Sequence, residues 1–265
     1  MSIAFLNNKL LIILLTIIAP ITRSVPHYQN SVSTSEISRP NLASTDFVRY
    51  KTTSAFEQYQ PKVMRIAIDP SNYGERYKID VNGNSLNNFP IVVLHETTES
   101  VTSAINTFKT PHPNDWNQVS YHTLISLDGT VIYLLHPEKR AFGAGNSAFE
   151  SSSGVETVQT SPNLPSSVNN FAYHVSLETP PDGRGTQNQY HSGYTDSQYK
   201  SLAWLLAQSS VPDDRITTHK DVDRSGQKID PRSFDFEKFL TILHTYRQPV
   251  DEKTSVKQSF NNRSE

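Results

Sequence analysis

The sequence contains no cysteine among its 265 residues. This absence excludes disulfide frameworks, zinc fingers and thiol catalysis, and it leaves nine histidines as the soft nitrogen ligands of the chain. The net charge is only −2 at pH 7, so there is no electrostatic case for a nucleic-acid partner. The sequence also has no internal repeat and no glycine-rich phosphate loop.

The first 24 residues differ from the rest of the chain. They contain Lys9, an apolar stretch over residues 10–18 and then Pro20. The stretch is short for a membrane span and has the length of a signal-peptide core, although a retained anchor is the alternative. We expect a signal peptide over residues 1–24, export to the periplasm, cell envelope or extracellular space, and no stable membrane anchor after its removal.

Two further segments are poor in apolar residues. Residues 25–60 are rich in Ser, Thr, Asn and Gln, which predicts a polar linker or an arm laid on the domain. Residues 248–265 have a similar composition and predict a disordered tail. One folded domain is therefore expected over residues 61–247, and we expect it to be a monomer.

Hydrophobic periodicity within this domain alternates between strand and helix patterns. Asp128-Gly129 lies between two apolar runs and predicts a hairpin within residues 119–135, and Thr195 with Gln198 forms a capping box. Further strands are predicted over 63–68, 90–95 and 171–179, helices over 100–110, 195–209 and 233–246, and a loop over 215–231. This order predicts an α/β (α+β) fold with a mixed central β-sheet flanked by helices.

The stretch "IVVLHETTES" (91–100) begins like the zinc-protease motif H-E-x-x-H, but Glu99 stands at the fifth position. That motif requires a helix, in which residues four apart share a face. Here His95 ends a short apolar run that follows Pro90, which is typical of a buried strand. We therefore expect His95 at a strand end, with any partner ligands elsewhere in the chain.

A charged loop near the carboxyl end supplies such partners. Catalytic zinc takes three protein ligands with nitrogen and oxygen donors and keeps a fourth position for water. His95, His219 and Asp230 would make this set. The simpler alternative is that His95 is a hydrogen-bonded structural residue.

Four blocks resemble the type 2 N-acetylmuramoyl-L-alanine amidases, zinc enzymes that share their fold with peptidoglycan recognition proteins. They occur in the family's order and span about residues 90–240: "IVVLHET", "QVSYHTLISLDGTVIYLLHPEKRAFGAGNS", "NNFAYHVSLET" and "TTHKDVDRSGQKIDPRSFDF". The resemblance implies a peptidoglycan or muropeptide substrate and hydrolysis of the amide between N-acetylmuramic acid and L-alanine.

The same resemblance implies roles for individual residues. His95, His219 and Asp230 match the Zn²⁺ ligands. The three matches to catalytic residues are Lys228 near the oxyanion, Glu178 for the attacking water, and Tyr121, found at the active site in some branches. The alternatives are a solvated charge for Lys228, a strand-end cap for Glu178 and a packing role for Tyr121.

Some positions depart from the family pattern. Glu96 stands where a second histidine is frequent, and Phe142-Gly143 stands where Trp-His is common. His174 to Leu177 replace a more usual Gly-Ile before the acidic residue. These departures affect the expected substrate contacts, for which we predict Arg140, Asn146 and Ser147.

The remaining histidines are expected to have other roles. We predict that His122 is a buried structural residue, and that His136, His174 and His191 are ordinary surface or strand residues. Two other functions stay open at this stage: a non-catalytic peptidoglycan-binding module of the same fold, and an endopeptidase that cuts within the stem peptide.

Overall fold

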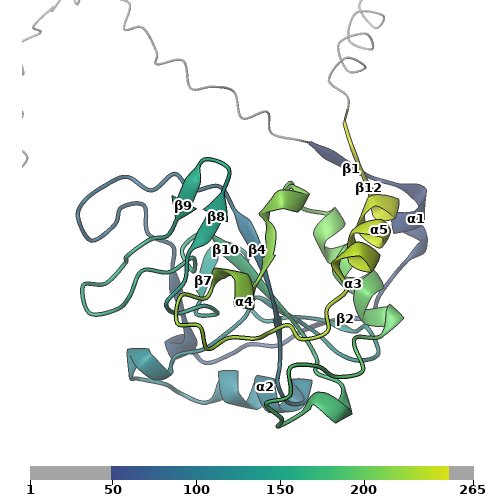
Figure 1. Ribbon diagram of the computed structural model, residues 1–265, viewed down its shortest axis with the longest axis horizontal. Coiled ribbons are helices and arrows are strands. Elements are labelled where there is room, and N and C mark those ends of the chain that lie inside the picture. The colour runs from purple at the N-terminus through teal and green to yellow at the C-terminus, as the bar shows by residue number, and fades with distance from the viewer. Residues whose placement is uncertain (1–48, 251–265) are drawn as a thin grey trace, which may run out of the picture. The chain divides into compact units, whose positions relative to one another are not determined.

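The computed structural model describes residues 49–250, and its centre is a mixed six-stranded β-sheet (Figure 1). In spatial order the strands are β11 (Ile216–Thr218), β4 (Ile91–Glu96), β10 (Ala172–Leu177), β5 (Thr123–Ile125), β6 (Val131–Tyr133) and β2 (Val63–Arg65). Only the β5–β6 pair is antiparallel, because these strands form a hairpin. The predicted mixed sheet is confirmed.

Helices cover both faces of this sheet. They are α1 (Ser54–Gln58), α2 (Val101–Lys109), α3 (Asp196–Ala207), α4 (His219–Val222) and α5 (Phe236–Tyr246). Helices α3 and α5 lie together on one side, and α2 lies at the end where β4 finishes (Figure 1). Side chains of β4 and β10 alternate between faces, so Leu94 and Val175 pack with α3 while Val93 and Ala172 join a second core.

Short elements complete the described part of the chain. Small two-stranded sheets are formed by β1 (Tyr50–Thr52) with β12 (Arg247–Pro249), β3 (Tyr73–Glu75) with β7 (Lys139–Ala141), and β8 (Phe149–Ser151) with β9 (Gly154–Glu156). Single helical turns are η1 (Pro70–Asn72), η2 (Asp115–Asn117), η3 (Pro181–Gly183) and η4 (Asp213–Arg215).

Local sequence signals explain several boundaries. Ser100 caps α2, and Thr195 with Gln198 forms the predicted capping box of α3. Gly129 has φ +84 in the β5–β6 turn, a conformation that favours glycine. A Cβ there would also lie 2.9 Å from the Ser197 carbonyl oxygen, so glycine allows the turn to approach α3.

Two segments contain more regular structure than the sequence predicts. The expected loop over 215–231 begins with β11 and α4, which are too short for periodicity to reveal. Residues 49–60 include β1 and α1, and Phe56 of α1 stacks on Trp204. The signal-peptide prediction and most of the predicted linker and tail fall outside the described residues.

Among the described residues, no helix combines the length and the apolar character needed to span a bilayer.

Candidate metal centre

The strand order brings two histidines to the same edge of the sheet. Strands β4 and β11 are parallel neighbours, with Leu94 paired to Thr218. His95 follows Leu94, and His219 follows Thr218, which caps α4 through its side chain. The carboxyl ends of parallel strands lie at the same end of a sheet. The two imidazoles therefore lie together, with ring centroids 4.6 Å apart. His95 lies in a strand, so the zinc-protease helix is excluded.

Asp230 joins the two histidines through the loop after α4. Its carbonyl accepts a hydrogen bond from the Lys220 N–H at 2.9 Å, which holds Asp230 against α4. Its Oδ2 lies 3.4 Å from His95 Nδ1, and its Oδ1 lies 3.0 Å from His219 Nδ1. One ligand atom from each of the three residues lies within 4.8 Å of the others. They form the candidate metal site.

The burial and the pKa values of His95 and Asp230 suit the binding of a metal ion. His95 is fully buried, and its Nδ1 has no hydrogen-bond partner within residues 49–250 although it faces the Asp230 carboxylate. Burial lowers the pKa of His95 to about 4, so its nitrogen lone pair is free at neutral pH. Burial alone would raise the pKa of Asp230, but its interactions with His219 and His95 hold it well below its ordinary value. Two imidazoles and one carboxylate suit zinc, whose tetrahedral ligands stand roughly 3.4 Å apart at the usual bond lengths.

Tyr121 and Lys228 lie beside this site. The Tyr121 ring stacks on His95 with centroids 4.4 Å apart, and its edge meets Phe108. Burial, and then the charge of Asp230, raise the pKa of Tyr121, so its hydroxyl remains a hydrogen-bond donor. Lys228 is exposed, and its charge is close enough to His95 to lower the pKa of that imidazole. Asp223 shapes the Lys228 loop by accepting backbone N–H bonds from Gln227 and Lys228.

Glu178 follows β10 on the same face as His95, because Ser176 pairs with His95 across the strands. Its carboxylate accepts N–H bonds from Val101 and Leu127 and pairs with Arg184 at 2.8 Å. Three of roughly four acceptor positions are therefore occupied, and about one remains. Glu178 thus makes the strand-end contacts of the simpler interpretation and keeps about one acceptor position for another partner.

A buried ionic network lies behind the candidate site, and sequence reasoning did not find it. Glu96, next to His95, accepts from Arg232 Nε at 2.6 Å and from His191 Nε2 at 3.1 Å. Arg232 also donates to the carbonyls of Gly183 and Asn188. One sequence feature could have indicated this network: Arg232 stands two residues after Asp230, in the order Asp-Pro-Arg.

The predicted substrate contacts fall in three different environments. Asn146 is exposed, and its carbonyl accepts from Arg224 beside the Lys228 loop. Arg140 stacks over Phe142 and donates to Thr160, so it is engaged within the fold. Ser147 is 1% exposed, and its hydroxyl bonds to the Ala144 carbonyl and the Val168 N–H. The Ser147 prediction is therefore wrong, because no polar group of its side chain is free for a substrate.

The histidines outside the candidate metal site also differ in burial and in contacts. His122 is fully buried and lies outside the candidate metal site, as predicted, and burial lowers its pKa to about 3. His136 is exposed. His191 was expected to be an ordinary residue, but its side chain is 0% exposed and pairs with Glu96. His174 is in a strand, fully buried, and in contact with His95.

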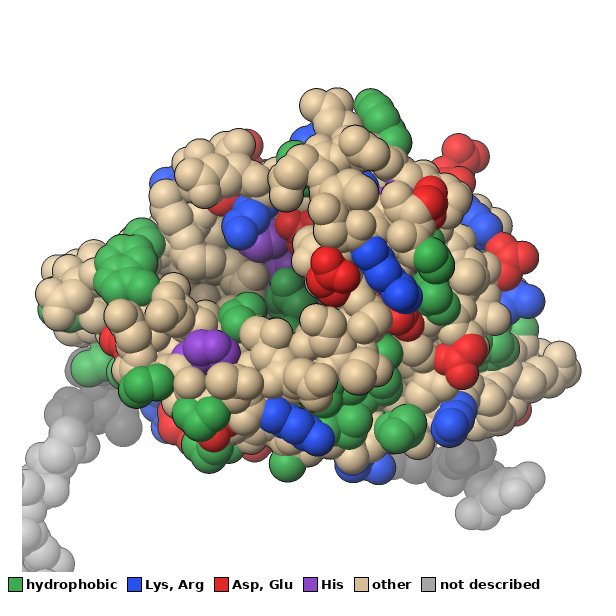
Figure 2. Space-filling view, turned by 90° about the horizontal axis from the view of Figure 1, so that it is seen from below, with side chains coloured by type: hydrophobic (Ala, Val, Ile, Leu, Met, Phe, Trp, Pro, Cys, Tyr) green, Lys and Arg blue, Asp and Glu red, His purple; other side chains and the backbone are tan. Residues whose placement is uncertain are grey.

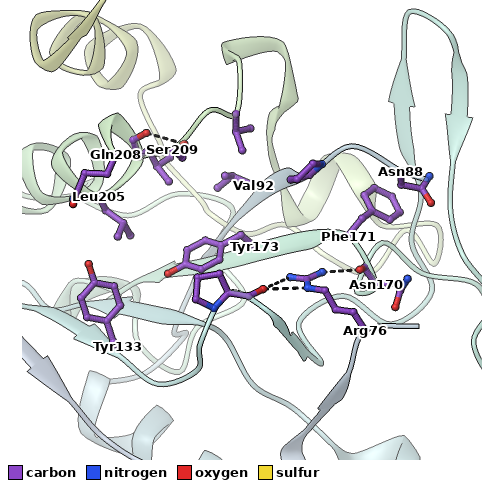
Figure 3. Close-up of a pocket in the computed structure, with 14 residues that line it drawn as sticks. Arg76, Asn88, Val92, Tyr133, Asn170, Phe171, Tyr173, Leu205, Gln208 and Ser209 are labelled. Carbon is purple, nitrogen blue, oxygen red and sulfur yellow. Dashed lines mark hydrogen bonds between the residues drawn. The ribbon is translucent and has the colours of Figure 1, made fainter. Parts of the chain in front are cut away.

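The surface at this end of the sheet is hollowed, with histidine at the floor and charged side chains at the rim (Figure 2). A separate cavity of about 450 Å³ lies at the opposite ends of β4 and β10, beside Val92 and Phe171 (Figure 3). Its lining is mostly apolar, and Arg76 there donates to the carbonyls of Pro137 and Asn170. This cavity holds no group of titratable side chains suited to catalysis.

Comparison with known families identifies the class. Residues 86–233 match the sequence model of a family described as N-acetylmuramoyl-L-alanine amidase, Amidase_2. This match covers more than half of the chain and includes the whole candidate metal site. The chain belongs to this amidase family, as its sequence blocks predict.

Solved structures of several amidases are similar to the chain. A selenomethionine derivative of AmpD is 22% identical, with a TM-score of 0.46 over 70% of this chain and 96% of that one. AmiD from E. coli, in complex with anhydro-N-acetylmuramic acid-L-Ala-D-gamma-Glu-L-Lys, is 19% identical, with a TM-score of 0.45 over 64% and 65%. The amidase LysC from Clostridium intestinale is 20% identical, with a TM-score of 0.43 over 70% and 99%. No curated protein matches the sequence.

Proposed function

We propose that this protein is a zinc-dependent N-acetylmuramoyl-L-alanine amidase that hydrolyses the amide between N-acetylmuramic acid and L-alanine in peptidoglycan or muropeptides. The observation that carries the proposal is the convergence of His95, His219 and Asp230 in a chain of this family. When bound, zinc would acidify a water molecule and polarise the substrate carbonyl.

Glu178 is proposed to handle the proton of the attacking water. Its remaining acceptor position would take this proton and return it to the nitrogen of the leaving L-alanine. The two N–H bonds and Arg184 support this role, because they fix the carboxylate and leave one lone-pair direction open.

Lys228 and Tyr121 are proposed to stabilise the negative charge that develops on the carbonyl oxygen. Both side chains carry donors beside the ligands, and neither side chain donates a hydrogen bond to another of the described residues. Such donors accelerate the reaction because they bind the charged transition state more strongly than the neutral amide. The exposed side chain of Asn146, near the Lys228 loop, and the side chain of Arg140 are the remaining proposed substrate contacts.

Mass spectrometry of muropeptides incubated with the purified protein and zinc tests this proposal. We expect free stem peptides with an L-alanine amino terminus, together with peptide-free sugars. Fragments cut within the stem peptide would instead identify an endopeptidase. Intact muropeptides in the presence of bound zinc would identify a binding module.

The matched variants are His219→Ala and Asp230→Ala, which should lose bound zinc and hydrolysis together. The proposed export adds a test of location, since the mature protein should be recovered outside the cytoplasm without residues 1–24.

A further inference from the structure

A fully buried histidine lies directly behind the first candidate ligand. His174 belongs to β10, the neighbour of β4, and its Nδ1 is 2.9 Å from His95 Nε2. The two ring centroids are 5.1 Å apart, and the rings are tilted by 47°. His95 is thus held from both sides, by His174 at Nε2 and by the candidate metal site at Nδ1.

The direction of this hydrogen bond follows from the ligand atom. His95 Nδ1 faces the Asp230 carboxylate and has no hydrogen-bond partner in the described part of the chain, so Nδ1 is the nitrogen available to a metal ion. A neutral imidazole that ligates through Nδ1 carries its proton on Nε2. His95 Nε2 therefore donates, and His174 Nδ1 accepts.

The surroundings hold His174 in this orientation. Its backbone N–H donates to His122 Nδ1 at 3.0 Å, and His122 Nε2 donates to the Lys139 carbonyl at 3.0 Å. The ring also packs against Gly143, where an added Cβ would lie only 2.5 Å from His174 Nδ1. Glycine at position 143 is thus what leaves room for the imidazole.

With respect to folding stability, an imidazole at position 174 is unfavourable. With Nδ1 as acceptor, the His174 proton is on Nε2, which is buried and has no partner among the described residues. A buried donor without a partner costs stability, whereas an apolar side chain would not. The benefit of His174 must therefore come from its Nδ1.

We propose that His174 is a positioning residue that accepts the His95 Nε2–H and so fixes the tautomer and orientation in which His95 Nδ1 ligates the metal. This inference rests on the proposed metal site and deepens it. Acceptors of this kind typically strengthen metal binding by about 10- to 100-fold.

Zinc affinity, measured by competition with a chromogenic chelator, tests the proposal in the purified protein. His174→Leu removes the acceptor and should weaken affinity by about 10- to 100-fold. His174→Asn places an oxygen close to the position of Nδ1 and should keep affinity within about threefold of the wild type. Ser176→Ala, on the same strand, is the matched control, because the Ser176 hydroxyl is buried and has no hydrogen-bond partner among residues 49–250.

Thermal unfolding of the metal-free variants verifies that each is folded. Equal affinity in His174→Leu and wild type would overturn the proposal, as would an equal loss in His174→Leu and His174→Asn. Neither result would affect the proposed amidase function, which fails separately if the zinc-loaded wild type leaves muropeptides intact.

Discussion

The carboxylate of Glu96 lies 2.6 Å from Nε of Arg232, and both side chains are at most 2% exposed. Glu96 follows the first candidate ligand along β4, and Arg232 stands two residues after the third. This buried ion pair therefore links the strand of His95 to the segment that carries Asp230. Its further bonds to His191 and the loop carbonyls tie that segment to the floor of the site.

Glu96→Gln should destabilise the protein, because Arg232 would keep its buried charge without a compensating carboxylate. Loss of one member of a buried pair costs about 3 kcal/mol or more in the free energy of unfolding. Denaturant-induced unfolding measures this change. Asp196→Asn breaks the exposed pair with Lys238 and should cost less than about 1 kcal/mol. A Glu96→Gln variant as stable as Asp196→Asn would contradict the role of the network.

Tyr121→Phe should leave zinc affinity unchanged and lower kcat by about a hundredfold, the effect of losing one oxyanion donor. The stacking on His95 is retained in this variant because it involves only the ring. Steady-state kinetics on a defined muropeptide, together with zinc titration, measure both quantities. An unchanged kcat would assign Tyr121 to packing alone.

Glu178→Gln should retain zinc and reduce kcat by about 10²- to 10⁴-fold, because an amide cannot take up the proton of the water. Arg184→Gln is the control, since it removes the ion-pair partner of Glu178 but keeps the carboxylate and its two backbone donors. Wild-type turnover in Glu178→Gln would leave Glu178 with only a structural role, as the acceptor of the Val101 and Leu127 N–H groups.

The contribution of Asp223 to the free energy of unfolding, made through the Lys228 loop, should be lost at acid pH. Although partial burial raises its pKa, hydrogen bonds from Ser225, Lys228 and Gln227 lower it to about 2, from 3.8. A carboxyl with a depressed pKa contributes stability above about pH 4, and this contribution is lost as the pH falls towards 2. We expect about 1 kcal/mol, since solvent screens this loop. Unfolding free energies of wild type and Asp223→Asn should differ at pH 6 and converge near pH 2; a constant difference would contradict this account.

The sequence predicts the elements with strong periodicity or capping signals. The strand that ends at His95, the hairpin around Gly129 and the capping box of α3 are all present in the structure. Elements β11 and α4 are only three and four residues long, and their conformation depends on pairing with β4 rather than on local pattern.

The candidate metal site could be proposed from the sequence because a chain without cysteine limits the available ligands, and because the resemblance to the amidase family selects His95, His219 and Asp230 among them. The residues that support it could not be predicted, since their roles depend on contacts between distant segments. Glu96 meets Arg232 across 136 positions, and His95 meets His174 across 79. The burial that separates Ser147 from the exposed Asn146 is likewise set by packing and not by the loop sequence.

A crystal structure of the zinc-loaded protein, with anomalous data collected at the zinc absorption edge, tests the central claim most directly. We predict one anomalous peak about 2 Å from His95 Nδ1, His219 Nδ1 and an Asp230 carboxylate oxygen. Strong zinc peaks elsewhere on the protein, with none between these three side chains, would contradict it.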